Sequence, residues 1–410
     1  MRVKPFLIAL LTALPLAAMP LPATADGGRW GGGWATAVQQ PTATWFPNWS
    51  QEGFDNHSVR QVIRTSATGT HLRVRLSNVY GTTPLRLTGA SIAKTTTGAA
   101  MRPATVRPLT FARSESVTMP AGGQAVSDPV RLPVRALEQL TVTLYFRGAT
   151  GPATFHSIAM ATSYRAKGDH RRDAGGAAFT ETSLSRYFLS GLDVSGRKNT
   201  VVAFGDSITD GYGATNDADD RYPDRLAERL ASSGTSVLNA GIGGNRVLND
   251  SACFGERATA RFRRDALDQP GVGTVIVLEG LNDILFPKNT GACATPNPQV
   301  TAEELIDGHR ALIRAARARG VRIIGGTLTP FKGSDLYSEY GEGVRQAVNH
   351  WIRTSGEYDA VADFDRALAN PEPGHAGELL PAYDSGDRLH PSPAGYQAMA
   401  DAVDLFTLTR

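Results

Sequence analysis

Two hydrophobic patterns divide the chain near residue 198. Before this point, apolar and polar residues alternate in short runs, the two-residue period of half-buried strands. The clearest runs cover 71–78 and 141–147, and others lie at 61–65, 84–93, 155–164 and 186–192. Residues 26–198 therefore predict an antiparallel β-sandwich, and the glycine-rich segment 27–33 predicts a flexible leader in front of it.

After residue 198, short apolar runs alternate with amphipathic stretches. The apolar runs have the length of strands that are covered on both faces, at 200–204, 236–239, 273–278, 321–326 and 359–363. Helical periodicity is predicted between them, at 223–231, 256–267, 301–313, 343–353 and 392–406. Residues 199–410 therefore predict an α/β domain with a doubly wound parallel five-stranded sheet. In such a sheet, an active site lies beyond the carboxyl ends of the strands.

The amino-terminal segment has the features of a signal peptide. Arg2 and Lys4 precede an apolar stretch, and small residues at 23–25 match a cleavage site. The apolar stretch is short and contains prolines, which argues against a membrane anchor. We expect residues 1–25 to be removed near Ala25, which predicts a secreted, extracellular protein.

Composition excludes several classes of protein. Of the 410 residues, 41% are hydrophobic and 20% are charged, which excludes a disordered, collagen-like or coiled-coil protein. The formal net charge is only +3, without a basic run, so no nucleic-acid partner is expected.

Four short segments with reactive or glycine-rich character lie at the carboxyl ends of the predicted strands or before the last predicted helix. The first places Ser207 on a tight strand-to-helix turn, the second contains Gly244, and the third contains Asn282. The fourth places Asp387 three residues before His390. At this spacing a carboxylate can hold the imidazole Nδ1–H, which leaves Nε2 free to take a proton from a serine.

In order and spacing, these segments resemble the four blocks of the SGNH subgroup of GDSL-type esterases and lipases. The resemblance covers about residues 198–406 and implies a flavodoxin-like SGNH hydrolase fold without a cofactor. It implies a catalytic triad and an oxyanion hole at the following positions: Ser207, His390 and Asp387 for the triad, and Ser207 N–H, Gly244 N–H and the Asn282 amide for the hole. The front half resembles the extra domain of some secreted, polysaccharide-associated members.

Each site residue also has a purely structural interpretation. Ser207 could be only the residue that caps a helix, Gly244 an ordinary turn glycine, and Asn282 the cap of a strand-end turn. Asp384 competes with Asp387 as the partner of the histidine, although its spacing fits less well. Asp206 is expected to form structural hydrogen bonds rather than to react.

The remaining polar and glycine-rich motifs favour no cofactor or metal. The acidic stretch 217–220 lacks the twelve-residue calcium-loop pattern, so a solvated loop is preferred to a calcium site. The glycines at 241–244 lack dinucleotide-loop spacing, and the other histidines lack metal-ligand spacing. Tyr222, Arg246 and Phe286 either line the pocket or pack in the core.

The two cysteines predict a disulfide. Cys253 lies shortly after the second segment and Cys293 lies in the loop after the third, so both loops are expected at the same sheet edge. An exported chain can keep such a bridge, which would tie down an otherwise mobile flap at 286–300. The alternative is two separate buried thiols.

Taken together, these features predict a secreted serine esterase that hydrolyses acyl esters, O-acetyl groups in particular, on a polysaccharide. The partner is then an acylated small molecule or polysaccharide. One alternative is a lipase or lysophospholipase of the same family. An alternative from another class is a secreted carbohydrate-binding protein whose esterase domain has lost its activity.

Overall fold

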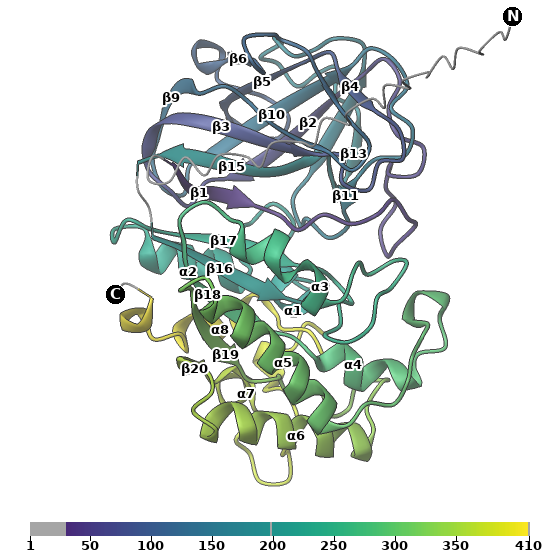
Figure 1. The fold of residues 1–410 in the computed structure, drawn as a ribbon, viewed down its shortest axis with the longest axis vertical. Coiled ribbons are helices and arrows are strands. Elements are labelled where there is room, and N and C mark those ends of the chain that lie inside the picture. The colour runs from purple at the N-terminus through teal and green to yellow at the C-terminus, as the bar shows by residue number, and fades with distance from the viewer. Residues whose placement is uncertain (1–29, 197–198, 409–410) are drawn as a thin grey trace, which may run out of the picture.

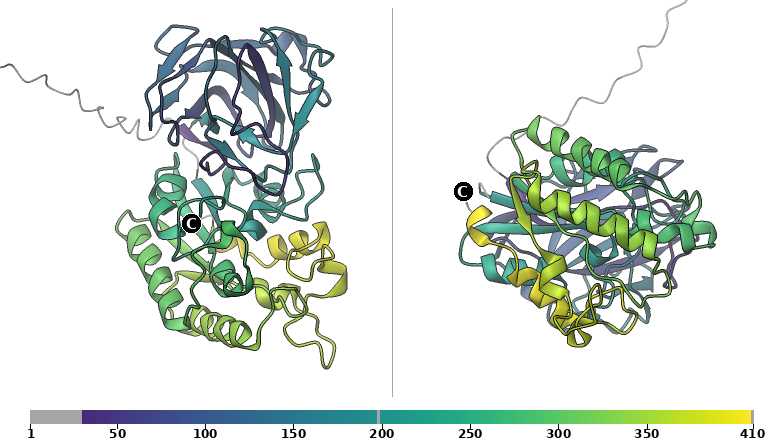
Figure 2. Two further views of the ribbon diagram at one scale, coloured as in Figure 1. Left: turned by 90° about the vertical axis from the view of Figure 1, so that its right-hand side faces the viewer. Right: turned by 90° about the horizontal axis from the view of Figure 1, so that it is seen from below.

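The computed structural model describes residues 30–196 and 199–408, and Figure 1 shows two parts stacked along the long axis. The upper part is β-rich and ends at residue 195, and the lower part alternates strands and helices from residue 199 (Figures 1 and 2). The predicted signal peptide, residues 1–25, lies outside the described residues. Within these described ranges, no helix has both the length and the apolar character needed to cross a membrane.

The β-rich part consists of antiparallel sheets around its own apolar core. One sheet has the strands β1 (Trp30–Ala35), β15 (Leu189–Ser195), β3 (Gly69–Ser77) and β8 (Gln124–Val126) in this order, with β9 (Val130–Val134) also paired to β3. The other sheet has the order β13 (Glu181–Ser183), β12 (Ser163–Lys167), β2 (His57–Arg64), β10 (Gln139–Phe146), β5 (Gly89–Lys94) and β6 (Arg107–Leu109).

Two small ribbons complete the β-rich part. They pair β4 (Leu85–Leu87) with β7 (Val117–Met119), and β11 (Phe155–His156) with β14 (Arg186–Tyr187). Leu72, Val74 and Leu76 of β3 are fully buried in the core, as their alternation predicts. The antiparallel, β-rich character of this part is confirmed.

The prediction of a flexible leader over 27–33 is wrong for its described residues, because Trp30–Ala35 forms strand β1. The glycines are needed for close packing. A Cβ on Gly32 would lie 2.6 Å from the side chain of Leu238, and one on Gly33 would lie 2.9 Å from the Thr65 hydroxyl. Because glycine has no side chain, this run shows no alternation of apolar and polar residues, but it allows the neighbouring backbones to approach closely.

The lower part contains a five-stranded parallel sheet. Its order is β17 (Thr235–Gly241), β16 (Asn199–Gly205), β18 (Val272–Leu278), β19 (Arg322–Gly326) and β20 (Ala360–Ala362). Residues 201–204 of β16 are fully buried, as expected for a strand covered on both faces. This order, with the first strand inside the sheet, confirms the predicted doubly wound α/β fold.

Helices cover the parallel sheet in two groups. In the first group, α2 (Tyr222–Leu230), α7 (Phe364–Leu368) and α8 (Pro393–Asp401) pack together. In the second, α3 (Ala258–Phe262), α5 (Ala302–Arg317) and α6 (Glu339–Thr354) contact one another. The short helices α1 (Ser207–Asp210) and α4 (Leu281–Leu285) follow strands β16 and β18 directly. A π-helical turn, Arg263–Leu267, continues α3, and 3-10 turns lie at Pro103–Thr105, Phe286–Lys288, Ala292–Ala294, Pro381–Tyr383 and Leu405–Thr407.

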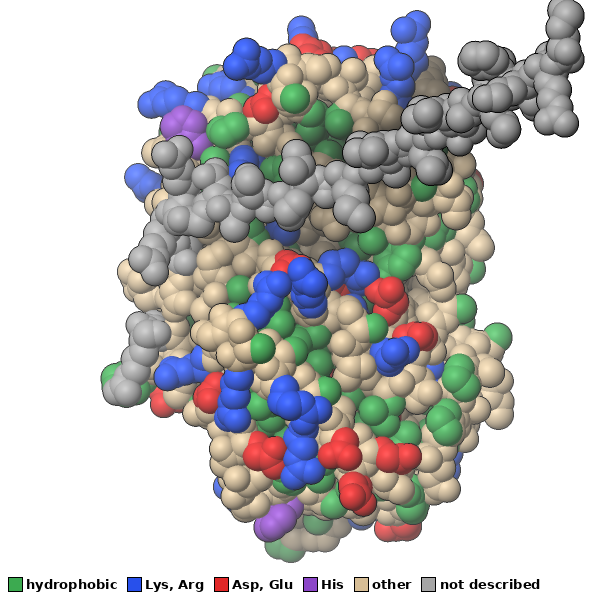
Figure 3. Space-filling model, viewed as in Figure 1, with side chains coloured by type: hydrophobic (Ala, Val, Ile, Leu, Met, Phe, Trp, Pro, Cys, Tyr) green, Lys and Arg blue, Asp and Glu red, His purple; other side chains and the backbone are tan. Residues whose placement is uncertain are grey.

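The β-rich part covers the outer edge of the parallel sheet. Strand β1 packs against β17, and Ala35, Ile158 and Met160 belong to the core of the lower part. The Ser66 hydroxyl accepts from the Val237 N–H at 3.0 Å and lies 2.8 Å from the Val237 carbonyl oxygen. Because the edge groups of β17 find partners here, the edge is not left open to another chain. On the face drawn in Figure 3, acidic and basic side chains are interspersed, in keeping with the small net charge.

Candidate active site

The carboxyl end of β16 leads directly into the site. Asp206 follows Gly205, the last residue of the strand, and caps α1, because its carboxylate accepts the Ile208 N–H at 3.0 Å. Ser207 is therefore the first helical residue rather than the cap, and the purely capping interpretation of this serine is wrong. As expected, Asp206 forms structural hydrogen bonds, and burial raises the pKa of its carboxyl group.

A chain of hydrogen bonds joins three of the predicted residues. Ser207 Oγ lies 2.8 Å from His390 Nε2, and His390 Nδ1 lies 2.6 Å from Asp387 Oδ2. An ionised carboxylate can only accept, so Nδ1 carries the imidazole proton and Nε2 is free to accept from the serine hydroxyl. Ser207 is 5% exposed, so the hydroxyl lies at the floor of the site.

The turn that carries His390 also positions Asp387. Asp387 Oδ1 accepts the backbone N–H groups of Leu389 at 3.0 Å and His390 at 2.8 Å, and Arg388 has a left-handed φ of 61°. Partial burial opposes ionisation of Asp387, but its hydrogen bonds and the charge of His390 outweigh this and lower the pKa to about 2. Asp384, the competing partner, instead accepts the backbone N–H groups of Gly386 and Arg388, both at 2.9 Å.

The three predicted oxyanion donors come from the first three segments. Within the described residues, the backbone N–H groups of Ser207 and Gly244 have no hydrogen-bond acceptor. Gly244 has a φ of 75°, and a Cβ there would overlap the ring of Phe254, so the position requires glycine. The Asn282 amide nitrogen lies 3.0 Å from the Asn245 carbonyl oxygen and 3.4 Å from Asp206, which connects it to the other two segments.

A buried arginine ties the strand ends together, and the sequence analysis missed it. Arg261 is fully buried and donates to the carbonyl groups of Ala240 and Gly205 and to the side chains of Asn245 and Glu279. Its place one turn after Ala258, on the buried side of α3, is the signal that could have identified it. Because Ala240 and Gly205 end β17 and β16, Arg261 holds the first two segments of the site together.

An aromatic side chain that the sequence analysis did not single out borders the histidine. The rings of Tyr212 and His390 have centroids 4.5 Å apart. The hydroxyl group of buried Tyr396 donates to the Tyr212 carbonyl oxygen at 2.6 Å, which fixes the backbone of this residue.

The three residues that could either line the pocket or pack in the core are packing residues. Tyr222 is fully buried and packs against Phe364. Arg246 is buried, donates to the Ala294 carbonyl oxygen at 3.1 Å, and has its guanidinium group 5.2 Å from the ring centre of Phe286. Phe286 is itself 4% exposed.

The acidic stretch 217–220 makes contacts with protein groups. Asp217 accepts from the backbone N–H and the hydroxyl of Thr162, both at 2.6 Å, and Asp219 accepts from Gln139 at 3.0 Å. The loop therefore joins the two parts of the chain rather than being only solvated. Over the part of the chain that the structure describes, no group of three His, Cys, Asp or Glu side chains could hold a metal ion.

The predicted disulfide is present between Cys253 and Cys293, whose Cα atoms are 5.2 Å apart. It joins the segment after β17 to the 3-10 turn at Ala292–Ala294. Phe254, the neighbour of Cys253, packs against Gly244, so the bridge supports one wall of the site.

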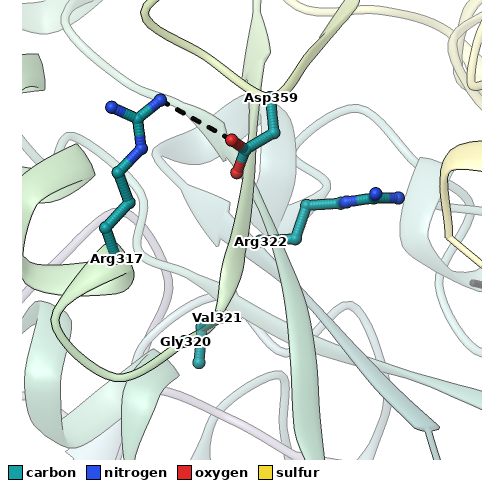
Figure 4. A pocket seen from close by; sticks show the side chains of 5 residues that line it. All are labelled: Arg317, Gly320, Val321, Arg322 and Asp359. Atoms are coloured by element: carbon teal, nitrogen blue, oxygen red, sulfur yellow. Dashed lines mark ion pairs between the residues drawn. The ribbon is translucent and has the colours of Figure 1, made fainter.

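A separate hollow of about 420 Å³ lies at the other end of the sheet (Figure 4). It is lined by Arg317, Gly320, Val321, Arg322 and Asp359, near the amino ends of β19 and β20. Its charged groups have their own partners, since Arg317 lies 3.6 Å from Asp359 and Arg322 donates to the Thr407 carbonyl oxygen. It is not the candidate active site.

Comparison with known proteins found a family model and several solved structures that are similar to part of this chain. The model of the GDSL-like lipase/acylhydrolase family matches residues 203–398. A catalytic mutant of Axe2, an acetylxylan esterase from Geobacillus stearothermophilus, is 23% identical, with a TM-score of 0.38 over 50% of this chain and 91% of that chain. A GDSL-like lipase from Bacteroides thetaiotaomicron is 20% identical, with a TM-score of 0.36 over 50% of this chain and 85% of that chain.

No curated protein matches the chain. The family match begins within the last residues of β16 and includes the three donor-bearing segments and the His390 turn described above. Residues 203–398 therefore form a GDSL-like lipase/acylhydrolase domain on a doubly wound parallel sheet, and this match supports a carboxylic ester hydrolase.

Proposed function

We propose that this chain is an exported esterase that removes O-acetyl groups from a polysaccharide, with Ser207 as the nucleophile. The observation that carries the proposed chemistry is the pair of hydrogen bonds from Ser207 Oγ to His390 Nε2 and from His390 Nδ1 to Asp387. This arrangement suits the activation of a hydroxyl group by a general base.

In the first half-reaction, Ser207 Oγ attacks the ester carbonyl carbon while His390 Nε2 takes the hydroxyl proton. The imidazolium then gives this proton to the leaving alcohol oxygen, and the acyl group remains on Ser207 as an ester. In the second half-reaction, His390 removes a proton from water, which attacks the acyl-enzyme. Acetate leaves, and Ser207 regains its proton from His390.

Asp387 stays ionised throughout this cycle. Its pKa, lowered to about 2, keeps the carboxylate charged at any ordinary assay pH. The charge stabilises the imidazolium that forms during both half-reactions, and the hydrogen bond keeps Nε2 directed at Ser207.

The oxyanion of each tetrahedral intermediate needs hydrogen-bond donors. The unpartnered N–H groups of Ser207 and Gly244 supply two, and the Asn282 amide supplies the third. Loss of one such donor typically lowers the rate by about 10²–10³-fold. The Asn282 amide now contacts Asn245 and Asp206, so it serves an oxyanion by directing one of its two hydrogens to it.

The choice of an extracellular polysaccharide is supported by the expected signal peptide and by the β-rich part. That part packs directly against β17, the outer strand of the parallel sheet, and this contact supports a role for it in binding the polymer.

A substrate panel tests the proposal. The purified mature protein is assayed on acetylated xylan, a long-chain p-nitrophenyl ester and a lysophospholipid. We expect acetate release from acetylated xylan to have the highest kcat/KM. A preference for the long-chain ester or the lysophospholipid would instead establish a lipase. A protein that binds xylan but cleaves none of these esters would be the inactive carbohydrate-binding alternative.

A further inference from the structure

One exposed tryptophan of the β-rich part stands at the catalytic site. Trp45 is 47% exposed, whereas most large apolar side chains of this chain are buried. Five large hydrophobic side chains are classed as exposed among the described residues, and Trp45 is the one tryptophan among them. The exposure of so large an apolar group calls for an explanation beyond packing.

The ring of Trp45 contacts both sides of the candidate site. It stacks on Phe254 with centroids 5.0 Å apart and an interplanar angle of 27°. It also meets the edge of Tyr212 at 5.8 Å, and Tyr212 is the ring that borders His390. A Cβ on Gly243, the residue before the oxyanion glycine, would lie 2.5 Å from the Trp45 ring.

The segment that carries Trp45 is held in place from both directions. The hydroxyl groups of Thr44 and Ser157 lie 2.6 Å apart, and the Asn48 amide donates to the Phe46 carbonyl oxygen at 3.2 Å. Before this segment, Gln39 and Gln40 donate to the carbonyl groups of Cys253 and Ala252, next to the disulfide. The ring therefore has a fixed position before a substrate arrives, which lowers the entropic cost of binding.

We propose that Trp45 is a substrate-binding residue on which a sugar ring of the substrate stacks. The β-rich part then supplies a carbohydrate subsite to the active site of the lower part. The proposal rests on the proposed function, because it assumes that His390 protonates the leaving sugar oxygen. One face of the indole packs on Phe254, and the exposed remainder is available to the ligand.

The geometry favours a sugar over an acyl chain as the occupant. The alcohol part of an ester leaves from the histidine side, because the histidine donates the proton to its oxygen. Tyr212 and Trp45 extend the site from His390 on that side. A pyranose ring presents an apolar C–H face that packs on an aromatic ring, while its hydroxyl groups stay hydrated at the rim.

The test separates the sugar from the acyl group. Wild type, Trp45→Ala and Trp45→Phe are assayed on an acetylated xylo-oligosaccharide, on ethyl acetate and on ethyl octanoate. We expect Trp45→Ala to raise KM for the acetylated oligosaccharide about tenfold, with kcat within about twofold, and to leave both ethyl esters within about twofold. Trp45→Phe keeps a stacking face and should recover most of the loss.

A matched control and a binding measurement complete the experiment. Tyr340 is equally exposed at 48%, and its hydroxyl group donates to the Val300 carbonyl oxygen. Tyr340→Ala should therefore leave kcat and KM unchanged on all three substrates. Calorimetric titration with unacetylated xylohexaose compares Ser207→Ala with Ser207→Ala carrying Trp45→Ala. We expect the double variant to bind xylohexaose about tenfold more weakly. This measurement does not depend on turnover.

Three results would overturn the proposal. A loss that appears on ethyl octanoate but not on the oligosaccharide would make Trp45 an acyl-chain contact. An equal loss on all three esters, with a lower kcat, would make the residue merely structural. Equal binding of xylohexaose by both serine variants would exclude stacking. Failure of the proposed function has a different signature, since wild type would then release no acetate from the oligosaccharide or Ser207→Ala would retain activity.

Discussion

At the scale of single residues, two aspartates precede His390 in the chain and have different roles. Asp387 binds the imidazole Nδ1 and two backbone N–H groups of the turn. Asp384 lies outside this arrangement and binds the N–H groups of Gly386 and Arg388. Spacing in the sequence favours Asp387, and the hydrogen bonds explain why, because only its carboxylate holds the proton on Nδ1.

Substitution of each aspartate should separate these tasks. Asp387→Asn removes the charge and can turn the imidazole to the wrong tautomer, so we expect kcat to fall about 10⁴-fold. Asp384→Asn keeps an acceptor oxygen for the same N–H groups, and kcat should stay within about tenfold. Initial rates on a short-chain ester measure both. Similar losses in the two variants would mean that Asp387 has no special role.

At the scale of elements, the sequence predicts what side-chain patterns specify and misses what close packing specifies. The predicted run 200–204 lies in β16, because a continuous apolar run suits a strand that is buried on both faces. The predicted helix 223–231 corresponds to α2, because its buried positions recur with the helical period. The sequence did not predict strand β1, because its glycines show no alternation of apolar and polar side chains. It did not predict the role of Arg261, because the carbonyl groups that this residue binds lie far from it in the sequence. Trp45 was missed because its neighbours come from the other part of the chain.

The disulfide is the element-scale feature with the clearest energetic consequence. Cys253 and Cys293 are 40 residues apart in sequence, and closing a loop of that size stabilises the fold by about 4 kcal/mol through the unfolded state. We expect the double variant Cys253→Ser, Cys293→Ser to lose about this free energy of unfolding in urea. Reduced wild type is the matched control and should lose a similar amount. A double variant as stable as oxidised wild type would contradict this role.

At the scale of the whole molecule, we expect acid stability to depend on a buried histidine other than His390. His309 of α5 is fully buried with Nδ1 2.6 Å from the Tyr358 hydroxyl, and burial lowers its pKa to about 4. In the unfolded chain, a histidine has a pKa near 6.5. The contribution of neutral, buried His309 to the free energy of unfolding is therefore complete above that pH, and it is lost as the pH falls from about 6.5 to 4. Burial raises the pKa of Asp283 to about 6, which acts in the opposite direction.

The contribution of His309 can be isolated by difference. Between pH 7.5 and pH 5, wild type should lose about 2 kcal/mol more free energy of unfolding than His309→Gln, which cannot titrate. The carboxyl groups affect both proteins alike, so they cancel in the comparison. Urea unfolding at the two pH values measures the difference. Parallel losses in both proteins would show that His309 titrates normally in the folded state.

The central claim is that Ser207 is the nucleophile of an ester hydrolase, and labelling of the enzyme together with turnover tests it most directly. Wild type is treated with a fluorophosphonate, digested and examined by mass spectrometry, and Ser207→Ala is assayed for acetate release. We expect the label on Ser207 alone and a fall in kcat on the order of 10⁶-fold in the variant. Substantial acetate release by Ser207→Ala, or a label on another residue of the inactivated wild type, would contradict the account.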